Sequence, residues 1–297
     1  SNLSFGASSL GGVFHSIQED EAIKAVHTAV ENGINFIDVS PYYGHLKAET
    51  VLGKALKDID RSKYYLSTKV GRYGKDGVNY WDYSAGKAKE SVYESMDRLH
   101  VSHIDLLNIH DIEFADLDMI CGETLPALVE LREKGIVKSV GITNLTLNHL
   151  KYVVENVPEG TVDSVLSFCH YCLNDDALTD FLDFFEARGI GVINASPFSM
   201  GLLTERGAPE WHPAPKPLQD LCRKAMQHCK SKDESIEQLA VKYSVSNPRI
   251  ATTLFSTSRP AAVLQNIKWA EQPLNEELLA EVHAILKPRF RDTWLNS

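Results

Sequence analysis

Short apolar runs, rich in β-branched residues, alternate with longer amphipathic stretches along almost the whole chain. The runs that we interpret as strands are 3–6, 35–38, 64–69, 104–110, 137–142, 162–168, 191–194 and 251–254. Between them, apolar residues recur at helical spacing, as at Ala22, Val26, Ala29 and Val30, which predicts helices that bury one face. Strands joined by such helices are typical of parallel sheets, so the pattern predicts an α/β fold, the (β/α)8 TIM barrel.

Glycines mark the expected ends of several helices. Gly33, Gly135 and Gly189 each follow a helical pattern and precede a predicted strand. A residue without Cβ takes the left-handed conformation at a helix C-terminus without strain. The chain has 297 residues, 43% of them hydrophobic, and barrels of this size commonly form one domain. We therefore expect residues 1–297 to form a single barrel domain.

Two segments depart from the alternation. Residues 198–217 are rich in glycine and proline and follow the seventh predicted strand, which indicates a long loop. We expect this loop to cover a bound cofactor. The tail after Leu286 mixes basic and aromatic residues, and it is expected either to shape the mouth of a pocket or to dock on the surface.

Composition excludes several classes of partner. The net charge is −10 without a dense basic cluster, which argues against nucleic-acid binding. No stretch approaches the roughly 20 apolar residues of a membrane span, and the N-terminus lacks the pattern of a signal sequence. We therefore expect a cytoplasmic protein without a membrane partner; the sequence leaves the oligomeric state open.

The five cysteines do not suggest a disulfide framework. Their number is odd and they are spread along the chain, which suits reduced thiols. Cys169 and Cys172 are three residues apart at a strand end, so their side chains would face opposite sides if the strand continued. Two such thiols cannot hold one metal ion, and we expect no metal.

Candidate chemistry lies at the ends of successive predicted strands. Asp38, Lys69 and His110 each end such a run, and Tyr43 follows shortly after the first. Side chains at these strand ends share one face of a β/α barrel, so we expect all four to meet around one bound molecule. A lysine ammonium near Tyr43 would lower the phenol pKa from about 10 toward neutrality, and Asp38 would hold that lysine. His110 would hydrogen-bond the reacting oxygen.

These four residues resemble the Asp, Tyr, Lys and His tetrad of the aldo-keto reductases. The matching segments, 36–44, 49–53, 140–144 and 195–197, keep the order and spacing of that family, and the similarity extends from Leu3 to about Leu286. The resemblance implies an enzyme that transfers hydride to or from a nicotinamide cofactor, with Tyr43 as the general acid or base.

The resemblance also implies a cofactor site. Thr143 and Asn144 would face the carboxamide, and Ser167 stands where the family often has a glutamine for that group. The loop after the seventh strand would approach the pyrophosphate, and a residue of the last core helix would contact adenine. The residues so assigned are Thr143, Asn144, Ser167, Ser196, Gly201, Leu202, Leu203, Ser256, Ser258, Arg259 and Asn266.

The expected cofactor is NAD. Ser256 and Ala262 stand where NADP-using members often place cations against the 2′-phosphate, and neither side chain can pair with that dianion. Arg259 lies in the same loop, and it is the residue that would permit NADP use.

Within the family, segments 5–11 and 108–113 are similar to those of plant members that oxidise L-galactose at C1 to L-galactono-1,4-lactone for ascorbate biosynthesis. The implied partner is therefore a small-molecule sugar. Candidate walls of the sugar pocket are Trp81, Tyr83, Phe114 and Trp294. Two alternatives stay open: a general reductase of other aldoses or carbonyls, and a regulatory subunit that senses the cofactor.

Overall fold

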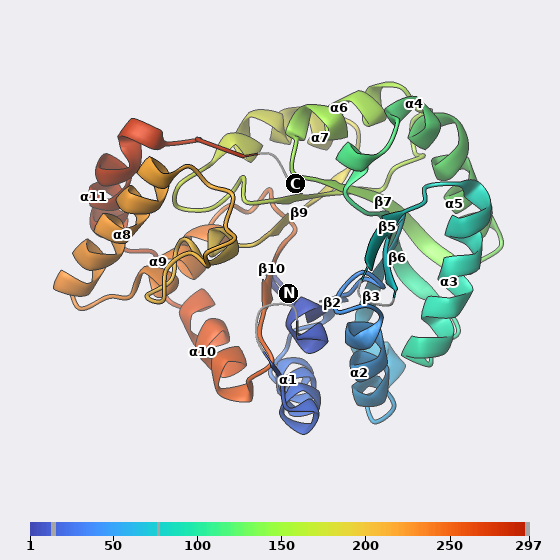
Figure 1. Ribbon diagram of the computed structural model, residues 1–297, viewed down its shortest axis with the longest axis horizontal. Helices are drawn as coiled ribbons and strands as arrows, with labels where there is room; N and C mark the ends of the chain where they lie inside the picture. Colours follow the sequence, from blue (N-terminus) through green and yellow to red (C-terminus); the bar gives the residue numbers. More distant parts are fainter. Residues whose placement is uncertain (13–15, 76–77, 295–297) are drawn as a thin grey trace.

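Eight parallel strands close into a barrel in the order β1-β10-β9-β8-β7-β6-β3-β2 (Figure 1). The computed structural model describes residues 1–12, 16–75 and 78–294. The barrel strands are β1 (Leu3–Gly6), β2 (Phe36–Asp38), β3 (Tyr65–Val70), β6 (Ile104–Ile109), β7 (Val137–Asn144), β8 (Ser164–Phe168), β9 (Gly191–Ala195) and β10 (Thr252–Ser256). The predicted (β/α)8 barrel is thereby confirmed.

Helices form a layer around the barrel (Figure 1). They are α1 (Glu19–Glu31), α2 (Lys47–Leu56), α3 (Ala85–Leu99), α4 (Leu117–Met119), α5 (Leu125–Glu133), α6 (Leu147–Glu155), α7 (Leu182–Glu186), α8 (Lys216–Ser231), α9 (Ile236–Ser244), α10 (Pro260–Ala270) and α11 (Glu276–Leu286). Short helical turns are η1 (Ala7–Gly11), η2 (Arg61–Lys63), η3 (Ile112–Phe114), η4 (Ile120–Thr124), η5 (Ala177–Phe181), η6 (Ser199–Gly201) and η7 (Lys287–Arg289). In the part of the chain that the structure describes, no helix has the length and apolarity to cross a bilayer.

The predicted helix ends are confirmed. Gly33, Gly135 and Gly189 have φ values of 92°, 73° and 67°, in the left-handed region. The stripe that includes Ala22, Val26 and Ala29 on α1 is buried, as the periodicity predicts.

Alternation along the strands separates two apolar cores. Leu106, Leu166, Ile193 and Leu254 form a small cluster of their own, whereas neighbouring strand residues such as Leu107 pack with the helices. Since successive side chains of a strand face opposite sides, the small cluster lies inside the barrel.

The interior becomes polar toward the carboxyl ends of the strands. Asn108 follows Leu106 by two residues, and its Nδ2 donates to Ser67 Oγ at 3.0 Å. Ser67 Oγ in turn donates to Asp38 Oδ1 at 2.9 Å. The interior of the barrel thus changes from an apolar cluster to a layer of hydrogen-bonded polar side chains at the end where the predicted site lies.

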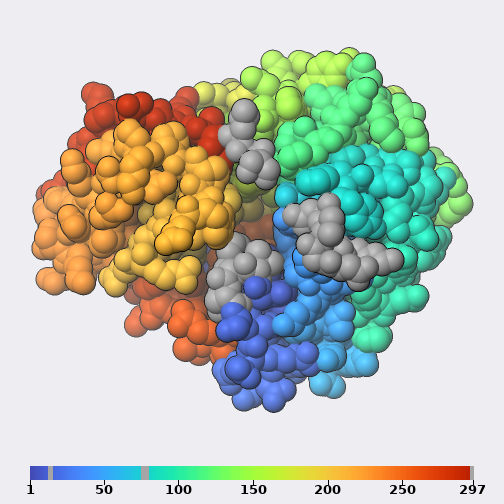
Figure 2. All heavy atoms as spheres, in the orientation of Figure 1, coloured from blue at the N-terminus to red at the C-terminus, as the bar shows by residue number. Residues whose placement is uncertain are grey.

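One element was not expected: an antiparallel hairpin of β4 (Arg72–Lys75) and β5 (Val78–Trp81) directly after β3. The chain leaves β3 at Gly71, whose φ is +97°, and a Cβ there would lie 2.4 Å from the Tyr83 ring. Glycine is therefore needed for this turn. Figure 2 shows a depression near the centre of one face of the molecule. The hairpin lies along one edge of this depression, and the gold segment after β9 lies along the opposite edge.

The C-terminal tail docks on the molecule. Arg291 pairs with Asp176 and Asp180, and its amide donates to Asn174 O at 3.0 Å. The Trp294 ring is buried, with its centroid 5.0 Å from that of His212 in the 198–217 loop. Of the two expectations for the tail, the structure therefore favours docking.

The cysteines are all free among the described residues. The strand does not continue through Cys169: β8 ends at Phe168, Cys169 has a φ of 64°, and Cys172 Sγ lies 3.3 Å from Cys169 O. The geometric premise for opposite faces was therefore wrong. Among the described residues, no cluster of three or more His, Cys, Asp or Glu side chains could hold a metal.

Candidate active site

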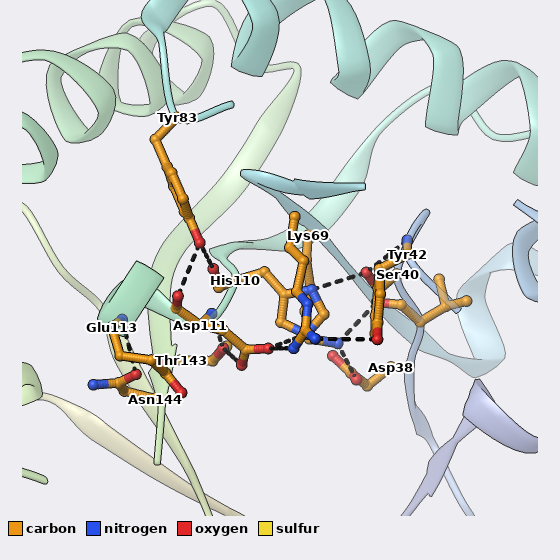
Figure 3. A network of polar contacts seen from close by, with 12 residues as sticks. Asp38, Ser40, Tyr42, Lys69, Tyr83, His110, Asp111, Glu113, Thr143 and Asn144 are labelled. Atoms are coloured by element: carbon orange, nitrogen blue, oxygen red, sulfur yellow. Dashed lines mark hydrogen bonds and ion pairs between the residues drawn. The ribbon is translucent and has the colours of Figure 1, made fainter. Parts of the chain in front are cut away.

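The four strand-end residues come together at the carboxyl end of the barrel. Asp38 ends β2, Lys69 lies in β3, His110 directly follows β6, and Tyr43 lies in the loop before α2. Asp38, Lys69 and His110 are buried, and Tyr43 is partly buried. Figure 3 shows Asp38, Lys69 and His110 facing one another within a continuous polar network.

Lys69 is fixed from the β2 side. Its Nζ forms an ion pair with Asp38 Oδ2 and donates to Val39 O at 2.9 Å. The same nitrogen lies 5.0 Å from the centre of the Tyr43 ring. Burial alone would lower the pKa of Lys69, but the charges and hydrogen bonds of Asp38 and Tyr43 outweigh it, and the pKa lies above its ordinary value. Lys69 is therefore an ammonium at neutral pH.

The predicted fall in the pKa of Tyr43 is wrong. Burial is the largest effect and raises the pKa to about 12, although Lys69 acts to lower it. The direction of the lysine effect was right, but desolvation of the phenolate is stronger. Tyr43 is consequently a protonated phenol at neutral pH.

His110 is a neutral imidazole. Burial, Lys69 and Arg72 all hold its pKa well below the ordinary value. Its Nδ1 lies 3.1 Å from Ser40 Oγ, and that oxygen already accepts from the Tyr42 amide at 3.2 Å. We assign the Ser40 hydroxyl as the donor to Nδ1, which leaves the proton of His110 on Nε2.

Arg72 and Asp111 were missed in the sequence. Arg72 Nη1 pairs with Asp111 Oδ2, and Nη2 donates to the Tyr42 hydroxyl at 3.1 Å. Each residue lies just beyond a strand end: Arg72 is three residues after Lys69, and Asp111 is one residue after His110. Their positions just after the neighbouring strands β3 and β6 are the signal that would have identified them.

Thr143 and Asn144, expected at the carboxamide, hold the loop after β6. Thr143 Oγ1 accepts from the Asp111 amide at 2.9 Å and donates to Asp111 Oδ1 at 3.3 Å. Asn144 Oδ1 accepts from the Glu113 amide at 3.1 Å (Figure 3). Asn144 Nδ2 donates to Thr146 O at 3.1 Å. Thr143 and Asn144 already use polar atoms to hold this loop, so a cofactor would compete for, or add to, those hydrogen bonds.

The loop that was expected to approach the pyrophosphate forms hydrogen bonds within itself. The amides of Gly201, Leu202 and Leu203 donate to Phe198 O or Ser199 O at 3.0–3.2 Å, and both leucine side chains are buried. Ser196 has a φ of 61°. In this structure the three amides therefore bond to carbonyl groups of the same loop, within residues 198–203.

The last group of cofactor positions surrounds β10 and α10. Ser256 Oγ accepts from the Ser9 amide at 2.9 Å, and it also bonds the hydroxyls of Ser8 and Ser9, which ties β10 to η1. Ser258 is buried, whereas Arg259 is exposed immediately before α10.

Two buried polar atoms fit a ligand that spans this side of the barrel. Ser167 Oγ at the end of β8 and Asn266 Oδ1 on α10 are buried without a hydrogen-bond partner among the described residues. Unpaired buried polar atoms cost free energy, and a ligand that satisfies them recovers it. The residues present are thus compatible with a long nicotinamide cofactor.

The four expected walls of the sugar pocket have different positions. Trp81 and Phe114 form a tilted aromatic pair with centroids 5.2 Å apart, and Trp81 is 41% exposed. Tyr83 is instead buried, with its hydroxyl 2.8 Å from the carbonyl oxygens of both His110 and Asp111. It supports the loop after β6 in place of lining a pocket. Trp294 packs against the 198–217 loop.

Strained backbone marks this end of the barrel. Asp111, Cys169 and Ser196, which follow β6, β8 and β9, all have positive φ without being glycine. Such conformations cost about 1–3 kcal/mol each and persist only where surrounding bonds impose them.

Comparison with known proteins agrees with this geometry. Residues 2–287 match the aldo/keto reductase family. L-galactose dehydrogenase of Arabidopsis thaliana is 45% identical over 99% of this chain and 93% of its own length. D-threo-aldose 1-dehydrogenase of a Pseudomonas species is 29% identical over 94% of this chain and 92% of its own.

Among solved structures, an aldo-keto reductase from Bacillus halodurans in its holo form superposes with a TM-score of 0.77. It is 26% identical, and the alignment covers 100% of this chain and 94% of that one. The chain belongs to the aldo/keto reductase family.

Proposed function

We propose that this protein oxidises L-galactose at C1 to L-galactono-1,4-lactone with NAD, a reaction that feeds ascorbate biosynthesis. The observation that carries the proposal is 45% identity, over nearly the whole length, to a protein named for the oxidation of L-galactose. The juxtaposition of Tyr43, Lys69 and His110 supplies groups for the proton transfer that such an oxidation needs. We propose the cytoplasm as its compartment, which suits five free cysteines.

In the proposed mechanism, the Tyr43 phenol first loses its own proton to solvent, and the resulting phenolate removes the proton of the C1 hydroxyl. Lys69 stabilises the phenolate before this transfer, and Asp38 holds the ammonium in place. His110 donates from Nε2 to the same substrate oxygen and orients it. A nicotinamide cofactor, which Ser167 and Asn266 would help to hold, would supply the hydride acceptor for C1. An anomeric hydroxyl is more acidic than an ordinary alcohol, which reduces the mismatch with the raised pKa of Tyr43.

Substrate stereochemistry tests the proposal directly. With NAD, kcat/KM for L-galactose should exceed that for D-galactose by at least about tenfold, because a site that pairs hydroxyls leaves buried polar groups unpaired with the wrong configuration. Comparable activity on L-fucose would mean that the 6-hydroxyl is not read. Equal or higher kcat/KM for D-galactose would contradict the assignment and favour another aldose, as the similarity to an aldose 1-dehydrogenase suggests.

Cofactor preference is a separate prediction. We expect NAD to be preferred, because Ser256 is bonded to Ser8 and Ser9 and Ala262 has no charge for a 2′-phosphate. Ser256→Lys combined with Ala262→Arg should increase kcat/KM for NADP. Ser256→Ala is the control, since it removes the same hydrogen bonds without adding a cation. Wild-type preference for NADP would contradict the prediction and implicate the exposed Arg259.

A further inference from the structure

The hairpin β4–β5 brings a second charged pair to the reaction centre. Arg72 opens the hairpin and lies opposite Trp81 in its register. Its guanidinium pairs with Asp111 Oδ2, and the same carboxylate oxygen lies 3.5 Å from His110 Nε2. His110 Nε2 is the nitrogen that we assign to the reacting oxygen. The pair therefore lies beside the nitrogen that is assigned to the reacting oxygen.

Aromatic rings surround the guanidinium. Its central carbon lies 4.0 Å from the centroid of Tyr42, 5.1 Å from Phe114 and 5.8 Å from Trp81. Such contacts hold the guanidinium in one orientation. The side chains of Arg72 and Asp111 are 14% and 6% exposed, so the pair is largely removed from water.

Stability does not account for this arrangement. A buried ion pair is often no more stabilising than apolar residues of the same volume, because both charges lose their hydration. Asp111 also has a left-handed backbone with a φ of 48°, imposed by Thr143 and Tyr83. Arg72 Nε is buried without a partner among the described residues, which adds a further cost. These costs are concentrated at the proposed site of reaction.

We propose that Arg72 and Asp111 recognise the hydroxyl on the sugar carbon next to C1, and that Trp81 and Phe114 accept the apolar face of the sugar ring. The inference rests on the proposed function, because it assumes an aldose beside His110. A sugar hydroxyl both donates and accepts hydrogen bonds, so it complements a carboxylate that only accepts and a guanidinium that only donates. Arg72 is therefore a specificity-determining residue.

The test is a cycle between one protein group and one substrate hydroxyl. L-galactose is compared with 2-deoxy-L-galactose, which lacks the proposed contact, and with L-fucose, which lacks a hydroxyl far from C1. For the wild-type protein with NAD, we expect kcat/KM to fall by about tenfold or more on removal of the 2-hydroxyl. We call kcat/KM for L-galactose divided by kcat/KM for 2-deoxy-L-galactose the 2-hydroxyl ratio, and the corresponding quotient with L-fucose the L-fucose ratio. In Arg72→Met the 2-hydroxyl ratio should shrink to less than about threefold, because the contact is already absent. The intrinsic effect of the missing hydroxyl on C1 cancels between the two proteins.

Arg61→Met is the matched control. Arg61 also pairs with a buried carboxylate, Asp105, and lies 4.8 Å from the Tyr64 ring, but it is at the opposite end of the barrel. This variant should keep the wild-type ratio. If Arg72→Met does not fold, Arg72→Lys decides, since it keeps a charge against Asp111 but lacks the planar fork. We expect it too to reduce the 2-hydroxyl ratio, while the L-fucose ratio stays as in the wild type.

The outcomes separate the two proposals. Turnover of L-galactose with an unchanged 2-hydroxyl ratio in the Arg72 variants would overturn this inference alone. An equal change in the L-fucose ratio would also overturn it, since that would indicate a general disturbance of the pocket. Absence of turnover of all three sugars by the wild-type protein would overturn the proposed function and this inference with it.

Discussion

Replacing Tyr43 with phenylalanine should lower kcat for sugar oxidation by about 10²–10⁴-fold, because it removes the proposed proton acceptor. The change deletes one hydroxyl and leaves the ring that packs at 5.6 Å from His110. Midpoints of thermal unfolding and the Kd for NADH should therefore stay close to wild type. The measurement is steady-state oxidation of L-galactose, followed by NADH absorbance.

The pH profile gives this prediction a control. Burial raises the pKa of Tyr43 to about 12, so the phenolate fraction of the free protein increases with pH over the whole neutral range. Wild-type kcat/KM for oxidation should rise between about pH 7 and pH 9, and the residual rate of Tyr43→Phe should lack this rise. A variant that keeps more than about a tenth of wild-type kcat would exclude Tyr43 as the general base.

Replacing Lys69 with methionine should reduce both turnover and stability. Without the ammonium the phenolate of Tyr43 loses its nearest positive charge, and we expect kcat to fall by about 10²-fold or more. Asp38 would also be left buried without its counterion, and breaking a buried pair in this way costs about 3–5 kcal/mol. Urea unfolding and steady-state kinetics measure the two effects separately.

A second buried lysine provides the comparison. Lys242 on α9 pairs with Glu234 at 2.9 Å, and their side chains are 7% and 10% exposed. Lys242→Met should lower stability while kcat stays near that of the wild type. Wild-type kcat in Lys69→Met would contradict the proposed role, and an equal loss of kcat in Lys242→Met would show that lost stability explains it.

Periodicity and strand-end position predict much of this molecule. Asp38, Lys69 and His110 can be grouped from their places in the sequence, since parallel strands of a barrel end on the same face. Gly33 and Gly135 can be assigned to helix ends because one local conformation demands that residue type. Both kinds of inference need only local sequence and a general rule of topology.

The features that the sequence could not predict depend on opposing energetic effects of similar size and on irregular backbone. The pKa of Tyr43 is a difference between burial and the charge of Lys69, and neither magnitude is encoded in spacing. Arg72 reaches the site through a hairpin whose strands lack regular apolar alternation. Tyr83 was expected in the pocket wall because it is aromatic and near Trp81, but the direction of its ring depends on the turn at Gly71.

The strained strand ends limit how this protein can be made more robust. Glycine at a left-handed position relieves strain, so Asp111 and Ser196 are the kind of positions that thermostability engineering selects first. At Asp111, however, glycine would delete the carboxylate that Arg72 and Thr143 hold. His100 ends α3 in the same conformation, on the opposite side of the barrel. Substitutions that raise thermal stability are therefore best placed at positions such as His100, where a gain in stability need not reduce substrate selectivity.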